Sequence, residues 1–435
     1  MKKVIIVIIL SLILVGCSKN TEFNENNLFN SNLLAVRGDD QSWGYINESG
    51  EVVIDFTYDE ASAFYKDIAV VLKDELYQLI DQKGKYVLEQ GYSSLLRDTN
   101  TGLIVFEQDE IYGLMDLNGD ILIEATYDYI GAFENDLALV STDDLFGYIN
   151  QDGEVAIDVT YPIARKFYNG YAVVSENGIS FGVIDTNEDT IIDFVYDDIS
   201  NVDSSGNVIA YTTQQLTPVF DLVNAPSQEI LLNDYKFIYT NDWFAGGMLY
   251  GAIRDQYREI YDHEGNRFNQ NDYTYLIIHG GYIVSAQDKN AVPTDMYQND
   301  LREFFIFNDD GTIKASAPIS ESGYVRYESN HEMQYLLVIY TENNVAVYGL
   351  DKTYILEADS LYEVSDDLFI TRVDGLFGAY DRDKNLVIDH EYSMLKVFDD
   401  GFIIYKKDGL YGIMNDQYEV VVDETYTNYN TNIAI

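Results

Sequence analysis

An aromatic residue followed fifteen positions later by a tyrosine recurs along most of this chain, usually every 34 or 35 residues. A turn glycine often stands at position seven, counted from the aromatic residue, after Asn or Asp at position four, and these residues favour tight turns. Repetition at such a fixed period is typical of folds built from stacked copies of one small unit. In six copies a glycine directly follows the aromatic residue: Trp43-Gly44, Tyr112-Gly113, Phe146-Gly147, Phe181-Gly182, Phe377-Gly378 and Tyr411-Gly412.

Degenerate copies extend the repeat to eleven units, whose first positions are residues 43, 77, 112, 146, 181, 220, 258, 304, 348, 377 and 411. In the unit sampled at 137–164, three runs read as strands, 137–142, 145–150 and 154–160, joined by short turns. The 38 Tyr and 21 Phe, against 5 Pro, also favour strands. Each unit is therefore predicted to be a three-stranded antiparallel meander.

The predicted fold is all-β, a propeller-like tandem array of about eleven such meanders. The repeated aromatic residues are interpreted as packing within and between units, because a small sheet cannot bury its own face. A ladder of aromatic residues for carbohydrate is the alternative. Eleven blades exceed the usual four to eight of one propeller, so we expect two rings or an open superhelix. The terminal run Ile433-Ala434-Ile435 resembles the first strand of a further unit, which would cap the last unit or close a ring.

The N-terminus has the features of a lipoprotein signal. Lys2 and Lys3 precede an apolar run from Val4 to Val15, which is shorter than the ~20 residues of a membrane-spanning helix. Leu14-Val15-Gly16-Cys17 resembles a bacterial lipobox, and Cys17 is the only cysteine of the chain. We therefore predict a signal peptide at 1–17, a diacylglyceryl group on Cys17, and a location at the cell membrane, on its extracytoplasmic side.

Composition and repeat quality divide the mature chain further. Residues 18–32 are rich in Asn, Glu and Ser and are predicted to be a flexible tether. Regular repeats are predicted for 33–203, diverged repeats with insertions for 204–376, and regular repeats with a terminal strand for 377–435.

The repeat pattern resembles the WG-repeat family of bacterial β-repeat proteins, which has an aromatic-Gly pair, then Tyr-Asp, then a Phe and a Gly. The resemblance covers nearly all of 33–435, although only Trp43 keeps the tryptophan of the family. A carboxylate also replaces the proline expected before Tyr-Asp. The resemblance implies an all-β repeat array, often on exported proteins, and no established activity.

The formal charge of −48 argues against nucleic acid as a partner and leaves cationic partners open. A carboxylate recurs at position twelve, and stacking in register would align these acids into a stripe. Such a stripe would attract Ca²⁺ or a basic partner; alternatively, each acid accepts hydrogen bonds within its own unit. The candidate stripe consists of Asp55, Glu89, Glu124, Asp158, Asp193, Asp389 and Asp423.

Divergence is concentrated in the middle of the array. An insertion runs from Gln287 to Arg302 where other units have a short turn, and it is either a binding loop or a neutral surface insertion. Trp243 is the second unusual feature: exposed, it would indicate a binding patch, and buried, ordinary packing. The candidate binding residues are Gln287, Asp288, Lys289, Tyr297, Arg302 and Trp243.

Catalytic motifs are scarce. His263, His279, His331 and His390 lie far apart, and no nucleophile stands beside a base in a known motif. We therefore expect no enzyme and no cofactor, Ca²⁺ aside. The predicted function is that of a membrane-anchored, non-catalytic binding module for a protein, glycan or cation. The alternatives are a passive structural protein of the cell envelope and a glycan-directed hydrolase with paired carboxylates.

Overall fold

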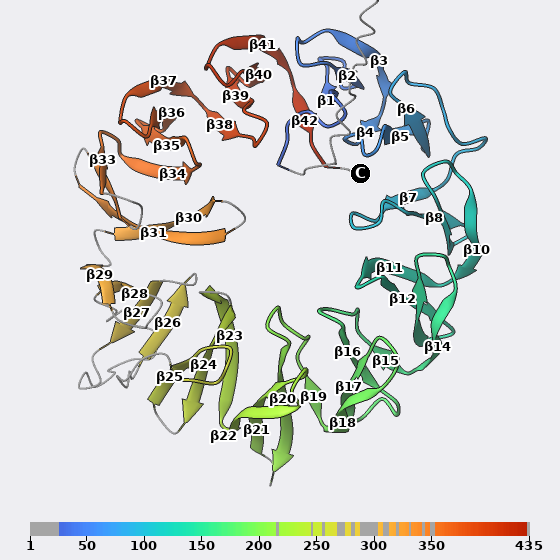
Figure 1. Cartoon of the computed structure of the whole chain (residues 1–435). Coiled ribbons are helices and arrows are strands. Elements are labelled where there is room, and N and C mark those ends of the chain that lie inside the picture. Colours follow the sequence, from blue (N-terminus) through green and yellow to red (C-terminus); the bar gives the residue numbers. More distant parts are fainter. Residues whose placement is uncertain are drawn as a thin grey trace, which may run out of the picture.

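The computed structural model describes residues 26–432 except 215–216, 245–246, 255–256, 268–274, 280–282, 288–302, 308–312, 319–321, 330–331, 342–343 and 349–352. All regular structure in these residues is β, in ten sheets. The eight-stranded sheet joins two four-stranded units through one parallel pair, Tyr327 and Val364. The described strands thus form eleven blades, as the repeat count predicts (Figure 1).

The blades follow the order of the chain, and the strands of each blade are named from the innermost outward. Blades 1 to 4 consist of β42 (Asn428–Asn430), β1 (Leu34–Arg37), β2 (Trp43–Ile46), β3 (Val52–Tyr58); β4 (Glu60–Ala61), β5 (Ile68–Lys73), β6 (Leu76–Asp81); β7 (Ser94–Arg97), β8 (Ile104–Gln108), β9 (Ile111–Met115), β10 (Ile121–Tyr127); and β11 (Tyr129–Glu134), β12 (Leu137–Thr142), β13 (Leu145–Asn150), β14 (Val155–Tyr161). Blades 5 to 8 consist of β15 (Ile163–Ala164), β16 (Tyr171–Ser175), β17 (Phe181–Asp185), β18 (Thr190–Tyr196); β19 (Asp198–Ile199), β20 (Asn207–Gln214), β21 (Thr217–Asn224), β22 (Glu229–Tyr235); β23 (Phe237–Phe244), β24 (Gly247–Arg254), β25 (Tyr257–Tyr261); and β26 (Tyr275–His279), β27 (Ile283–Gln287), β28 (Glu303–Phe307), β29 (Ile313–Pro318). Blades 9 to 11 consist of β30 (Ser322–Ser329), β31 (Glu332–Tyr340), β32 (Val345–Tyr348), β33 (Tyr354–Leu356); β34 (Ser360–Val364), β35 (Leu368–Val373), β36 (Leu376–Asp381), β37 (Leu386–Tyr392); and β38 (Met394–Val397), β39 (Ile403–Lys407), β40 (Leu410–Met414), β41 (Val420–Tyr426).

The blades form one ring, in place of the two rings or open superhelix expected from their number (Figure 1). The C-terminal strand β42 completes blade 1 by pairing with β1, where Ala35 lies opposite Asn430 and Arg37 opposite Asn428. Eleven blades fit in one ring because they stand around a wide centre, so each turns by only one eleventh of a circle from its neighbour. The closing strand is thus 428–430. Ile433, Ala434 and Ile435, predicted to be a strand that caps the last unit or closes a ring, lie outside the described residues.

Most blades have four strands, whereas three were expected. The additional strand comes from the segment predicted to be a crossover between units. In blade 5, for example, β15 pairs with β16 through Ile163 and Ala164. The tyrosine that ends the outermost strand is therefore followed almost at once by the innermost strand of the next blade.

Strand register explains the offset of fifteen. The first aromatic residue of the unit lies on the third strand, and the tyrosine lies directly opposite it on the outermost strand, as for Trp43 and Tyr58. The same pairing joins Tyr77 with Tyr92, Tyr112 with Tyr127, Phe146 with Tyr161, Phe181 with Tyr196, Phe220 with Tyr235, Phe377 with Tyr392, and Tyr411 with Tyr426.

The repeated glycine permits a bulge in the outermost strand. In blade 1 the register shifts between Trp43 and Tyr45, and a Cβ on Gly44 would lie 2.7 Å from the carbonyl oxygen of Ile54. Gly113, Gly147, Gly182, Gly378 and Gly412 would meet the corresponding carbonyl oxygen at 2.6–2.7 Å. Blade 2 has Gln78 at this position, and its outer segment contacts β6 only through isolated bridges. In the blades that have it, glycine is thus needed because the bulged strand approaches the third strand too closely for a side chain. Blade 6, with Asp221 at this position, has a smaller register shift between Phe220 and Leu222.

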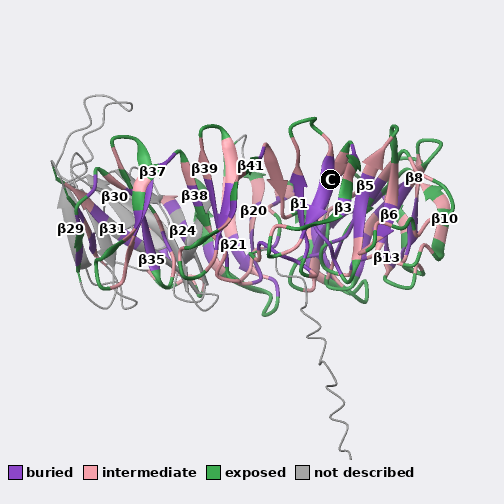
Figure 2. Ribbon diagram, turned by 90° about the horizontal axis from the view of Figure 1, so that it is seen from above, coloured by how far each residue is buried: buried purple, intermediate pink, exposed green. Residues whose placement is uncertain are grey.

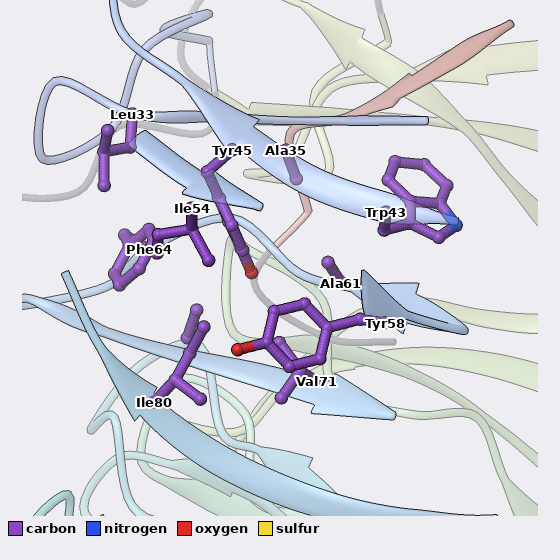
Figure 3. Packing of buried hydrophobic residues seen from close by; sticks show 11 residues of the cluster. Leu33, Ala35, Trp43, Tyr45, Ile54, Tyr58, Ala61, Phe64, Val71 and Ile80 are labelled. Atoms are coloured by element: carbon purple, nitrogen blue, oxygen red, sulfur yellow. The ribbon is translucent and has the colours of Figure 1, made fainter. Parts of the chain in front are cut away.

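The cores lie between blades. One cluster joins Tyr45 and Ile54 of blade 1 to Phe64, Val71 and Ile80 of blade 2, and all five side chains are buried (Figure 3). The rings of Tyr45 and Phe64 are 4.9 Å apart. Most of the repeated tyrosines and phenylalanines after the first position are buried, whereas the first aromatic residues, Trp43 and Phe377 excepted, are half-buried in the described units. This placement supports their interpretation as packing within and between units.

The turns lie at the two margins of the ring, which Figure 2 shows edge-on as a band with its exposed residues concentrated at those margins. The inner-turn face carries the turns between the first and second strands and between the third and fourth strands of each blade. The hairpin face carries the turns between the second and third strands, together with the crossings to the next blade. In the predicted Asn/Asp-to-Gly turns, which lie on the inner-turn face, the Asn150 side-chain oxygen accepts the amides of Asp152 and Glu154, at 3.1 and 2.9 Å.

Candidate functional site

The position-twelve carboxylates lie on the outermost segments of seven blades, within or beside the bulge. All seven side chains are exposed, and in the described part of the chain none of the seven carboxylates accepts a hydrogen bond. They are Asp55, Glu89, Glu124, Asp158, Asp193, Asp389 and Asp423. Each stands on a different blade, and the described residues contain no group of three or more His, Cys, Asp or Glu that could hold a metal ion.

The carboxylate of the Tyr-Asp pair has a different role, which the sequence did not reveal. Asp59, next to Tyr58, accepts the backbone amide of Asp74 at 3.0 Å. Asp128 accepts the amide of Asp143 at 2.8 Å in the same way. Asp197, next to Tyr196, accepts that of Thr213 at 2.6 Å. Asp359, which follows Ala358 and not a tyrosine, accepts that of Asp374 at 2.7 Å. These carboxylates cap the turns of the hairpin face.

Those turns carry further acids. In blades 2 to 4 both central residues of the turn are acidic, exposed and in the left-handed region of φ, which a two-residue hairpin turn of this type requires. Asp and Asn tolerate positive φ better than most residues, but Glu does not share this advantage. Counting all described blades, exposed acids occupy seven hairpin turns: Asp39, Asp40, Asp74, Glu75, Asp109, Glu110, Asp143, Asp144, Glu176, Asp374 and Asp408.

Blades 3 to 5 are the most acidic part of the ring. Residues 94–199 contain 22 Asp and Glu against three Lys and Arg: Arg97, Arg165 and Lys166. Arg97 is buried and donates to the carbonyl of Ile68 at 3.1 Å, and burial lowers the pKa of its guanidinium to about 10. Arg165 and Lys166 pair with Asp198 and Glu134, at 2.8 and 3.1 Å.

Blades 1, 2, 10 and 11 have cations beside their hairpin turns. Arg372 lies 4.9 Å from the ring of Phe377, and Lys406 lies 4.5 Å from that of Tyr411. Arg37 and Lys73 stand 5.9 Å from Trp43 and Tyr58. In blade 5, Arg165 lies 5.8 Å from the ring of Phe181. The hairpin face is consequently less negative at blades 1, 2, 10 and 11 than at blades 3 and 4.

Buried polar groups connect neighbouring blades. Asp98 of blade 3 accepts the amide of Phe133 of blade 4 at 2.8 Å. Between blades 6 and 7, Tyr250 donates to Asp203, and Asn207 donates to the hydroxyl of Tyr250 at 2.9 Å. Burial, followed by the charge of Asp203, raises the pKa of the Tyr250 phenol, so the phenol stays protonated and acts as a donor. These groups stabilise blade contacts.

The histidines are dispersed. Nε2 of His390 lies 2.8 Å from Thr371 Oγ1, and burial lowers the pKa of the imidazole. His263 contributes its carbonyl oxygen, which accepts from Asn207 at 2.9 Å. His279 belongs to β26, and His331 lies outside the described residues. The structure thus places His263, His279 and His390 on three different blades.

The candidate binding loop falls largely outside the described residues, which exclude Asp288, Lys289, Tyr297 and Arg302. Gln287 ends β27. Trp243 lies in β23, where its backbone is opposite Met248. These placements leave the loop and the tryptophan as predictions.

Cys17 and the signal peptide also lie outside the described residues. In the part of the chain that the structure describes, no helix has the length and apolar composition needed to cross a membrane. Leu28 and Phe29, predicted to belong to the tether, are buried in the folded part.

The sequence matches the profile of a family described as WG containing repeat at five stretches, 43–77, 112–146, 146–178, 181–211 and 377–411. These are units that the sequence pattern marks as regular. No curated protein matches the chain.

Among solved structures, the chain is similar to a eukaryotic initiation factor, with 8% identity, a TM-score of 0.41, and 92% of this chain and 97% of that chain covered. It is also similar to Hsv2p of Kluyveromyces lactis, with 11% identity, a TM-score of 0.30, and 58% and 96% covered. BamB of Moraxella catarrhalis is similar with 12% identity and a TM-score of 0.27, and the match covers 65% of this chain and 89% of that chain.

Proposed function

We propose that this protein is a non-catalytic interaction scaffold, a lipoprotein held at the extracytoplasmic side of the cell membrane, that binds a partner protein on the hairpin face. The observation that carries the proposal is the regular presentation of exposed acids on that face by a closed ring. Each of the seven described hairpin turns contains at least one exposed acid, while the buried polar groups hold the blades together. A rigid repeat ring with short turns presents an extended surface, which suits protein binding.

Charge favours a basic partner at blades 3 to 5, where acids outnumber cations most strongly. Complementary charge increases the association rate and is screened by salt. Binding at this sector should therefore weaken as the salt concentration rises.

Photo-crosslinking in cells tests the proposal. A photoreactive amino acid at Leu145, beside the acidic turn of blade 4, is compared with one at Val155, on the outermost strand of the same blade. Both side chains are exposed, by 37% and 51%. We expect a discrete protein adduct from Leu145 that is lost at high salt, and none from Val155.

Identical adduct patterns at the two positions would contradict a binding face. The absence of any discrete adduct would favour the passive structural protein of the cell envelope. Cys17→Ser tests anchoring separately: we expect the variant to leave the membrane fraction, whereas retention would contradict lipidation at Cys17.

A further inference from the structure

The chain enters the ring at the seam between blades 11 and 1. Leu28 and Phe29 are 1% and 6% exposed, and the ring of Phe29 packs edge-on against Phe402 at 4.8 Å. Their cluster includes side chains of both blades: Leu34, Val36 and Ile46 of blade 1, and Phe398, Ile404, Ile413, Val422 and Tyr426 of blade 11. The segment is thus part of the closed ring.

Hydrogen bonds fix this segment to particular turns. The amide of Phe29 donates to Asp400 Oδ2 at 2.9 Å, and the amide of Asp399 donates to the carbonyl of Asn26 at 2.9 Å. Asp399 and Asp400 lie in the turn between β38 and β39, which belongs to the inner-turn face. The entry point is therefore on that face.

A contact with blade 2 agrees with this placement. Gln82 Nε2 donates to the carbonyl of Ser31 at 3.5 Å and to Asp67 Oδ1 at 2.6 Å. Asp67 lies in the turn between β4 and β5, again on the inner-turn face. The segment 26–33 is thus held by turns of two blades, 11 and 2, on the same side of the ring.

The length of chain before this segment limits how the ring can stand. Ten residues, 18–27, separate Cys17 from Leu28, and at about 3.5 Å per residue they span at most ~35 Å. An outermost strand of seven residues, such as β41, is ~23 Å long, so the two faces are roughly that far apart. A connection from the inner-turn face to the hairpin face would use about two thirds of that span, before any path around the blades is counted.

From this geometry we infer that the ring stands on the membrane with its inner-turn face toward the lipid and its hairpin face outward. The inference rests on the proposed lipid anchor and deepens it, because it assigns one face to the bilayer and leaves the hairpin face for the partner. The anchoring segment and the ring-closing strand β42 meet at the same seam.

Fluorescence quenching in vesicles tests this orientation with the full, lipidated chain. Lipidation occupies the sulfur of Cys17, the only cysteine, so one introduced cysteine can be labelled alone. Gln417→Cys and Thr425→Cys place a label near the two ends of β41, and both native side chains are exposed. With quenchers on the lipid headgroups, we expect several-fold stronger quenching at position 417 than at 425.

Two controls test whether the orientation depends on the attachment of segment 26–33 to the ring, which we call pinning, or only on the lipid anchor. The double variant Leu28→Ser, Phe29→Ser should bring the two quenching values together. If this variant does not fold, a Gly-Ser insertion of about 20 residues after Asn20 lengthens the tether without changing the ring, and it should have the same effect.

Equal quenching at 417 and 425 in the pinned, membrane-bound protein, or stronger quenching at 425, would overturn the orientation and leave the anchor intact. Mass spectrometry that finds Cys17 unmodified, together with a protein that does not bind vesicles, would overturn the anchor and the orientation with it.

Discussion

The carboxylate of Asp128 accepts the backbone amide of Asp143, fifteen residues further along, at 2.8 Å. Asp128 follows the last tyrosine of blade 3, and Asp143 begins the hairpin turn of blade 4. The second residue of the Tyr-Asp motif therefore secures the turn of the following blade, which explains why an exposed acid recurs beside a packing tyrosine.

Asp128→Ala should lower the stability of the ring by about 1 kcal/mol, because it removes a single hydrogen bond at an exposed site. The midpoint of urea unfolding measures this change. Glu124→Ala is the matched control, since Glu124 is an exposed acid on the same blade as the Tyr127-Asp128 pair and its carboxylate, unlike its carbonyl oxygen, accepts no hydrogen bond in the described structure. Equal effects of the two substitutions would show that the cap contributes nothing.

Gly44→Ala should destabilise the protein by about 1–3 kcal/mol, because the new Cβ would lie 2.7 Å from the carbonyl oxygen of Ile54. Gly38→Ala serves as the control in the same blade: its Cβ would come no closer than 3.3 Å, to the side chains of Asp40 and Phe56. The difference between their unfolding midpoints is the measurement. A Gly44 variant as stable as the Gly38 variant would contradict the proposed need for close approach.

His390 should make the protein less stable below neutral pH. Burial lowers the pKa of its imidazole in the folded state, while nearby Asp389 and Asp359 raise it less. The unfolded chain then binds a proton at His390 more readily than the folded chain does. The stability contributed by neutral His390 is therefore complete above the pKa of the unfolded state, and it is lost as the pH falls through the pKa of the folded state.

His390→Gln should therefore show a smaller loss of thermal stability than the wild type between pH 7 and about 5. Measuring both proteins in the same buffers cancels the effect of the other acids, apart from those that face His390. If the stability of the two proteins changed with pH in parallel, the role of His390 in the pH dependence would be contradicted.

Removal of residues 428–435 should open the ring, because it deletes β42 and its pairing with β1. It also removes the bond from the Asn430 side chain to the carbonyl of Ala61, at 2.9 Å. We expect faster amide exchange in β1 and a larger radius of gyration in small-angle X-ray scattering. Removal of 433–435 alone is the control, and a truncated ring that matches it in both measurements would rule out closure by β42.

Millimolar Ca²⁺ should raise the melting temperature no more than Mg²⁺ does. The seven position-twelve acids are exposed and stand on different blades, so no set of oxygens among them is close enough to surround one ion. Thermal unfolding with each ion is the measurement. A shift specific to Ca²⁺ that disappears when Glu124, Asp158 and Asp193 are neutralised would establish the cation stripe instead.

Periodicity predicted the units because the residues that build a blade must recur in its register. Trp43 and Tyr58 are fifteen residues apart in sequence because they lie opposite each other across one bulged hairpin. The same logic located the tight turns, where Asn150 binds the following amides.

Ring closure was harder to predict, because it depends on small angles summed over eleven blades and on a three-residue strand, β42, with no apolar pattern. The short innermost strands were missed for a related reason. A two-residue strand such as β15 has no periodicity of its own, and only pairing with β16 defines it. The capping role of Asp128 could not be predicted either. Its carboxylate binds a backbone amide of the next unit, so the contact produces no pattern of residue types within one unit.

The seam at β42 and β1 also means that the fold does not determine at which blade the chain begins. The peptide chain links all neighbouring blades, blades 11 and 1 included, and the ring is closed inside blade 1, where β42 pairs with β1. A chain with its natural ends joined and a new opening in any exposed hairpin turn would contain the same contacts. The contacts of the ring therefore do not depend on where the chain ends are placed.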